Sequence, residues 1–230
     1  TIIFGCKKPS ERSCWKSNGE VSHINKIITT TNKITVLDNL NLILINDSLN
    51  EIIIEGPKNL IKLIELDQKN HQITIKNNNR CNFLRKNMDI NIHYHYKQLD
   101  SLILKGYGNV SNNGEMNHSI FINAKDALCS INLKLNNDSN KIIIQNGSTD
   151  INLSGHCSYF YFYNEGFGPL KAFELEAKKT HIHSNSISNS EINVTEQLNA
   201  EIRNNGNIYY KGTPTIIQTT NSGNGRLIPQ

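Results

Sequence analysis

The sequence predicts an all-β protein whose short strands stack into a solenoid. Apolar and polar residues alternate with period two along most of the 230 residues, the pattern of strands that bury one face. Nearly every gap between these runs holds Asn, Gly, Asp or Ser, residues that favour turns. Hydrophobic residues make up 37% of the chain, and a chain of this length can bury a real core.

The strand candidates are short runs centred on Ile, Leu or aromatic residues. In the first half of the chain they are 33–37, 40–45, 51–55, 60–66, 72–76, 89–96 and 101–105. In the second half they are 119–123, 131–135, 141–145, 150–154, 159–163, 173–177, 180–184, 191–194, 198–202 and 207–211. The run at 60–66 also fits one or two helical turns, but the flanking strands favour a strand there.

A repeated unit begins near residue 100, in which turn residues precede an Ile- or Val-centred strand. Its copies include Gly108-Asn109-Val110, Thr149-Asp150-Ile151, Ser190-Glu191-Ile192 and Gly206-Asn207-Ile208. Ile131 and Ile151 are twenty residues apart, close to one coil of a β-solenoid. Such units bury an apolar face only by stacking, and their Asn residues can then form ladders. A β-sandwich is the competing architecture, and the repetition favours the solenoid.

The first residues resemble the end of the signal peptide of an exported protein. The chain starts at Thr1 without a Met, so we expect a fragment or a processed product. The segment 1–6 is apolar up to Cys6 and resembles a bacterial lipobox, which predicts lipidation of Cys6. We therefore expect a signal-peptide remnant, lipidation site and tether at 1–20, and one domain at 21–230. The alternative is an ordinary first strand with a buried Cys6. No other stretch approaches the roughly 20 apolar residues that span a membrane.

Export permits disulfides. With Cys6 lipidated, Cys14, Cys81, Cys129 and Cys157 remain, and three pairings are open. Cys14 with Cys81 is favoured, because Cys14 lies in a loose segment that needs an anchor. For Cys129 and Cys157 the favoured interpretation is two small buried residues, and a bond between them is the alternative. None of the spacings is CxxC, which argues against zinc and thioredoxin-type sites.

Histidines occur in pairs at alternate strand positions. His93 and His95, like His181 and His183, would each share a strand face and could bind a metal. The residues between them are apolar and suit the core, so solvent-facing histidines are the simpler interpretation. We expect no metal and no cofactor.

Asp126, Asp138 and Asp150 recur every twelve residues and are candidates for a catalytic set. Glycoside hydrolases need two carboxylates roughly 5 to 9.5 Å apart. The twelve-residue spacing is not the coil length, and Asp138 and Asp150 suit turns, so the pattern favours turn chemistry over catalysis. No nucleophile elbow, phosphate-binding Gly loop or HExxH motif is present.

The densest aromatic run is 159–163. A strand there would bury Phe160 and Phe162 and expose Tyr159, Tyr161 and Tyr163, which predicts a ligand contact through the three tyrosines. The alternative is an aromatic strand covered by the loop at 164–172. The net charge of +4 is scattered, so no nucleic-acid partner is expected.

Several stretches resemble one known family. They are 14–19, 56–61, 79–85 ahead of the strand at 89–96, 104–110, and 206–214 through 223–225. They resemble the head domain of autotransporter adhesins called the GIN domain, common in exported proteins of Bacteroidota, over about residues 14–230. The resemblance implies a right-handed parallel β-helix-like fold and supports a Cys14–Cys81 bridge. Several expected repeat glycines are replaced, as at Ser148-Thr149-Asp150, which makes the coil register harder to assign.

The predicted function is that of a lipid-anchored cell-envelope protein, an outer-membrane lipoprotein. It would act as an adhesin-like or structural binding module for a glycan or protein at the cell surface, and not as an enzyme. Its membrane contact would be the lipid anchor alone. The alternative is a polysaccharide lyase or hydrolase on a β-helix scaffold, and a third is an envelope protein with no specific ligand.

Overall fold

The protein is all-β, as predicted. A computed structural model describes residues 18–79 and 89–230. One 14-stranded sheet and one short helix account for its regular structure in these residues. Cys6, Cys14 and Cys81 lie outside the described residues.

The first strands are β1 (Val21–Ile27), β2 (Lys33–Asn39), β3 (Asn41–Asn46) and β4 (Glu51–Pro57), followed by helix α1 (Lys58–Ile61). Next come β5 (Ile64–Lys69), β6 (Gln72–Asn77), β7 (Asn91–Tyr96), β8 (Ser101–Asn113) and β9 (Ile120–Asn164). The last are β10 (Leu170–Ser184), β11 (Ser190–Ile202), β12 (Ile208–Lys211), β13 (Ile216–Asn221) and β14 (Leu227–Pro229).

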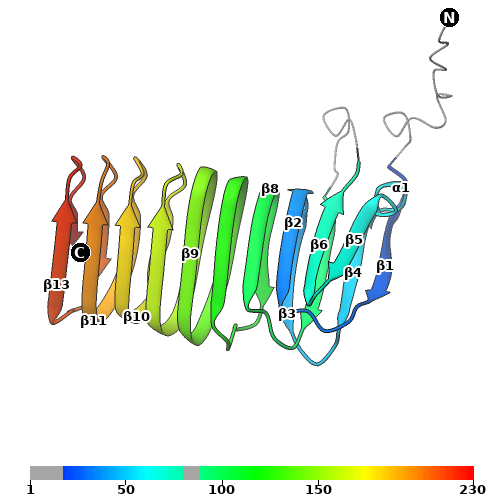
Figure 1. Cartoon of the computed structure of the whole chain (residues 1–230), viewed down its shortest axis with the longest axis horizontal. Helices are drawn as coiled ribbons and strands as arrows, with labels where there is room; N and C mark the ends of the chain where they lie inside the picture. Colours follow the sequence, from blue (N-terminus) through cyan, green and yellow to red (C-terminus); the bar gives the residue numbers. More distant parts are fainter. Residues whose placement is uncertain (1–17, 80–88) are drawn as a thin grey trace, which may run out of the picture.

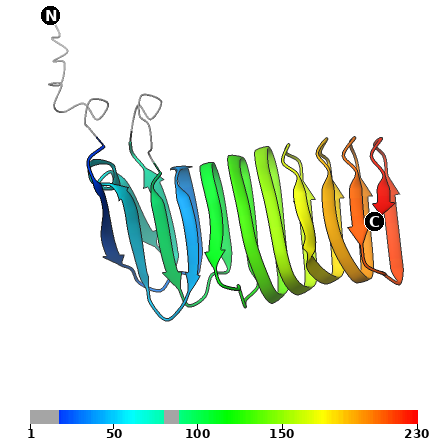
Figure 2. The same cartoon turned by 180° about the vertical axis from the view of Figure 1, so that it is seen from behind.

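From β8 onward the chain forms a stack of parallel passes. Leu170 of β10 is aligned with Ile151 of β9 and with Ser190 of β11, so the chain returns to the same place about every twenty residues. Figures 1 and 2 show these passes side by side, from the green β8 to the red β13. The repeated unit that the sequence predicts from residue 100 corresponds to these passes.

Each long strand bends between two layers. The first half of β8 pairs with β2 and its second half pairs with β3. In β11 the first half pairs with β12 and the second half with β13. We call the layer that contains β2 and β13 the β2 layer, and the layer that contains β3 and β12 the β3 layer.

Side chains of both layers meet in one apolar core. Alternate residues along each pass are buried, as in Phe160, Phe162 and Ile182 of the β2 layer and Ile131 and Ile151 of the β3 layer. Full burial of such a side chain stabilises the fold by about 1.5–3 kcal/mol. Because the buried side chains of successive passes stack on one another, the passes together enclose one continuous core.

The N-terminal end of the stack has a different pattern. Strand β4 runs antiparallel to β1 and β7, and β5 runs antiparallel to β6. The expected strand at 60–66 is wrong in its first half, because Pro57 precedes the short helix α1, which buries the adjacent Leu60 and Ile61. Strand β5 then begins at Ile64. In the described part of the chain, no helix has the length and apolar character needed to cross a membrane.

The corners between passes depend on residues that accept a positive φ. Asp126 and Asn146 have φ of 53° and 59°, and Gly155 has φ of 104°. Side-chain amides also link equivalent positions of adjacent passes, as predicted for stacked Asn residues. Asn152 donates to Asn132 over 2.8 Å, and Asn146 donates to Asp126 over 3.0 Å.

Gly155→Ala is expected to destabilise the protein strongly. An added Cβ would lie 1.9 Å from the carbonyl oxygen of Leu135 in the preceding pass. The positive φ costs about 1–2 kcal/mol and the clash adds about 1–3 kcal/mol. Thermal unfolding followed by circular dichroism measures the loss. Gly114→Ala is the matched control, because Gly114 has φ of +87° but no heavy atom within 4 Å of its added Cβ. Equal losses in the two variants would show that the close approach carries no cost.

Candidate functional site

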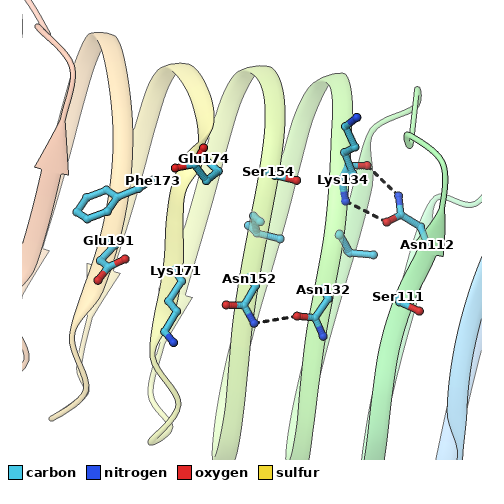
Figure 3. A pocket seen from close by; sticks show the side chains of 12 residues that line it. Ser111, Asn112, Asn132, Lys134, Asn152, Ser154, Lys171, Phe173, Glu174 and Glu191 are labelled. Atoms are coloured by element: carbon cyan, nitrogen blue, oxygen red, sulfur yellow. Dashed lines mark hydrogen bonds between the residues drawn. The ribbon is translucent and has the colours of Figure 1, made fainter.

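An open groove crosses the outer surface of the β3 layer. Its volume is about 580 Å³, and it extends over four strands, from β8 through β9 and β10 to β11. Figure 3 shows its lining side chains projecting from successive passes. They are Ser111, Asn112, Asn132, Leu133, Lys134, Asn152, Leu153, Ser154, Lys171, Phe173, Glu174 and Glu191.

A bulge in β10 creates one end of this groove. Lys171 is aligned with Asn152, but the next aligned pair is Glu174 with Ser154, so β10 has one more residue here than β9. Ala172 and Leu175 are both buried, and the two residues between them, Phe173 and Glu174, are not. A bulge redirects side chains in this way, and bulges are common beside functional sites.

The ring of Phe173 lies at the edge of the groove with a lysine beside it. The Nζ of Lys211, on β12, is 4.4 Å from the centroid of the ring. The Asn193 side chain donates to the Phe173 carbonyl oxygen over 3.3 Å and so ties the bulge to β11. A half-buried aromatic ring held in this way offers an apolar surface of fixed orientation.

Amide side chains line the middle of the groove in fixed orientations. Asn112 donates to the Lys134 carbonyl oxygen over 2.8 Å and accepts from the Lys134 amide over 2.9 Å. Asn152 donates to Asn132, as the dashed line in Figure 3 shows. Asn112 thus has both its amide nitrogen and its amide oxygen engaged between strands, whereas Asn152 uses only its nitrogen. Among the described residues the side-chain oxygen of Asn152 has no hydrogen-bond partner, so it can accept from a ligand.

Charged side chains complete the lining. Lys134 forms a 2.8 Å ion pair with Glu115. Within residues 18–79 and 89–230, the side chains of Lys171, Glu174 and Glu191 have no hydrogen bond or ion pair. Donors and acceptors of both charges are thus free for a ligand, next to an aromatic ring. This arrangement suits a polar ligand that also carries an apolar face.

The tyrosines predicted as ligand contacts lie on the other layer. Phe160 and Phe162 are buried, and Tyr159 is the most open of the three tyrosines, with 38% exposure. Tyr161 and Tyr163 are half-buried, because side chains of adjacent passes pack on them. The Nζ of Lys141 lies 5.0 Å from the Tyr161 ring centroid, and the His181 ring lies 5.4 Å from it on the next pass. The row is therefore part of a packed surface ladder and lines no part of the groove.

Each predicted histidine pair lies on the outer face of its strand. His93 bonds to Glu55 over 2.9 Å and His95 to Asp47 over 2.7 Å. His183 bonds to Glu201, and its ring stacks on His181 with centroids 4.5 Å apart. In the part of the chain that the structure describes, no three His, Cys, Asp or Glu residues gather into a metal site.

The aspartates weighed as a catalytic set lie in separate places. Asp126 is exposed at a corner and accepts from Asn146, while Asp138 and Asp150 border two different hollows. Cys129 and Cys157 are free thiols, so the open pairing between them does not occur. Burial raises the pKa of the Cys157 thiol to about 11, so the thiol is protonated at neutral pH.

Residues 31–214 match the family described as "Putative auto-transporter adhesin, head GIN domain". The chain belongs to this family. The match begins just before β2 and ends after β12, so it includes the whole groove. The predicted resemblance is therefore confirmed. No curated protein matches the chain.

Several solved protein structures superpose on this chain over most of its length. A putative adhesin of Bacteroides fragilis has 23% identity and a TM-score of 0.81, with 92% of this chain and 97% of that chain covered. A putative adhesin of Parabacteroides merdae has 20% identity and a TM-score of 0.65, with 92% and 96% covered. A protein of Parabacteroides distasonis described as a putative lipid binding protein has 19% identity and a TM-score of 0.64, with 91% and 97% covered. At these identities the similarity shows the shared fold.

Sequence reasoning predicted none of the residues that line the groove as site residues, Phe173 included. Alternation predicts a regular strand at 173–177, in which Phe173 has no special position. A change in spacing in the sequence could have revealed this irregularity. The small and apolar residues are spaced by two, then three, then two positions, at Leu170, Ala172, Leu175 and Ala177. That change marks a bulge.

The pKa of the His181 imidazole is expected to lie below that of a free histidine. Burial lowers the pKa of His181, the charge of His183 lowers it further, and Glu201 partly opposes them. NMR titration of the imidazole measures this pKa. His183→Asn removes the repulsion between two imidazolium charges and should raise the His181 pKa. Glu201→Gln removes the attraction of the carboxylate for the imidazolium and should lower the His181 pKa. Glu174→Gln, on the other layer, is the control and should leave it unchanged. A fall in the His181 pKa in His183→Asn would contradict this account.

Proposed function

We propose that this protein is an adhesin-like binding module of the cell envelope and that the groove in the β3 layer is its binding surface. The observation that carries the proposal is the β10 bulge, which turns Phe173 out of the regular alternation beside free polar groups. The family description supports a binding role.

The ligand proposed for the groove is an extended glycan. A sugar ring has an apolar C–H face that packs on an aromatic ring and a rim of hydroxyls that bond to amides and carboxylates. Both kinds of partner are present, in Phe173 and in Asn152, Lys171 and Glu191. Neighbouring strands are about 4.8 Å apart, so the polar groups repeat along the stack at a regular interval. A linear polymer laid across the passes can therefore contact several of them at once.

The proposal includes binding without turnover. The carboxylates that the sequence suggested for catalysis, Asp126, Asp138 and Asp150, do not share a groove. The adhesin descriptions of the family and of the similar structures support a non-enzymatic role.

We also propose that the passes wind as a right-handed parallel β-helix. Parallel strands joined by a crossover connection are right-handed in about 98% of cases. The parallel alignment of β9, β10 and β11 supports extending this rule to the stack.

The proposed envelope location rests on the sequence at the start of the chain. Cys6 would carry the lipid, with residues 1–20 as remnant and tether and 21–230 as the domain. A Cys14–Cys81 disulfide would hold the tether to the domain. The protein would be an outer-membrane lipoprotein that meets its glycan or protein partner in the periplasm or at the surface.

Phe173→Ala is expected to weaken glycan binding at least tenfold, because about 1.4 kcal/mol of stacking and positioning would be lost. Binding is first detected on a glycan array and by polysaccharide pulldown, and affinities for the hits are then measured by calorimetry. Phe167→Ala is the matched control, because Phe167 is 61% exposed and outside the groove.

Two outcomes would contradict the proposal. Loss of binding in Tyr159→Ala but not in Phe173→Ala would move the site to the tyrosine row. Appearance of hydrolysis or lyase products during the assay would establish an enzyme instead.

Cys6→Ala is expected to release the protein from the membrane. The chain is expressed behind a signal peptide in a bacterial host that processes lipoproteins, and a clickable palmitate analogue labels acylated protein. The unaltered chain should label and fractionate with membranes, because the thiol of Cys6 is the predicted acylation site. Ser10→Ala is the control and should behave like the unaltered chain. Membrane association that persists without label in Cys6→Ala would refute the anchor.

A further inference from the structure

The last pass of the stack has an edge without a partner strand. Among the described residues, β13 pairs with β11 alone and β14 pairs with β12 alone. All six residues of β13 are exposed. The backbone N–H and C=O groups on the outer edge of this pass are therefore open to pairing with another strand.

Apolar side chains of the core also end at this edge. Ile217 is aligned with Leu198, which is fully buried, yet Ile217 is 44% exposed because no other pass among the described residues covers it. Ile216 is 49% exposed, and Leu227, aligned with the buried Ile208, is half-buried. This end of the stack therefore exposes apolar core side chains together with unpaired backbone N–H and C=O groups.

The charges at the two ends of the stack differ. The segment 212–225 contains no Asp, Glu, Lys, Arg or His. Charged residues and prolines usually protect sheet edges, and β13 contains neither, whereas β14 contains Pro229 and follows Arg226. At the opposite end, β1 contains Lys26, and β5 contains Glu65, Asp67 and Lys69. Head-to-tail contact would therefore place charges against an uncharged apolar edge.

We propose that two copies of this chain associate end to end through β13 and β14, related by a two-fold axis. The uncharged edge of β13 then meets its own copy, the two β13 strands run antiparallel, and the sheet continues across the contact. Ile217 and Leu227 become covered on both sides. The contact is only one pass of chain wide, so we expect a weak and reversible dimer.

Such a dimer would carry two copies of the groove in one rigid body. A long polymer that reaches both grooves would bind by avidity, without any new contact in either groove. The dimer does not depend on the proposed glycan function, because its formation is measured without a ligand.

Sedimentation velocity of the unlipidated 230-residue chain from 1 to 500 μM tests the proposal. The expected result is a reversible shift from monomer to dimer. The double variant Gln218→Lys/Thr220→Lys places like charges across the contact and should raise the dissociation constant at least tenfold. Both positions are exposed, so folding should persist, and circular dichroism checks this. Ile187→Lys, which changes a 58% exposed Ile in the loop between β10 and β11, is the matched control.

Hydrogen exchange keeps the test decisive if the double variant misfolds. In the unaltered chain, amides in 212–225 should exchange more slowly as concentration rises, while those of β1 should not change. A monomer at every concentration would overturn the proposal. A dimer that protects a different segment, or one that the folded double variant forms unchanged, would also overturn it.

Discussion

Backbone pairing between passes about twenty residues apart is the constraint on which the rest of this structure depends. The ladder aligns each residue with its counterpart in the next pass, so one environment repeats along the stack. Inward positions then form apolar columns, and outward positions form ladders such as Asn132 with Asn152. The same alignment brings the Leu135 carbonyl against Gly155, where only a glycine leaves room. The register of the stack therefore determines which positions are buried, which surface side chains pair, and which corners require glycine.

The alternation that predicted the strands arises only where a strand has one buried face. It therefore found the strands inside the stack, where Ile142 and Ile144 are buried and Lys141 is exposed. It missed β1, β13 and β14, which lie at the ends. All of β13 is exposed, so no difference between its faces was present to detect. The error at 60–66 has another origin, because the helix after Pro57 buries two adjacent residues, which a strand on one face cannot do.

The candidate site shows what a single sequence leaves undetermined. Alternation predicted correctly that Phe160 and Phe162 are buried and that the tyrosines face outward. It did not indicate that Lys141 and His181 would pack against Tyr161, because that contact depends on which passes become neighbours. Phe173 presents the opposite case. The irregular spacing between Ala172 and Leu175 was visible, but the outward turn of Phe173 is defined only against the aligned strands β9 and β11.

A regular stack presents nearly the same surface at every level, so a ligand could slide along it without preferring a position. A fixed binding site needs a local departure from the repeat, and the β10 bulge supplies one. The core tolerates it, because Ala172 and Leu175 remain buried on either side, and Thr180 is again aligned with Phe160 and Leu198. The pairing of β10 with β11 is shifted at two places between Ala172 and Lys179, so the irregularity is confined to that stretch of β10 and its partners. A stack of this kind can acquire a specific site at one level because the parallel pairing resumes on both sides of the irregular stretch, as it also does after the shift between Leu104 and Tyr107 of β8.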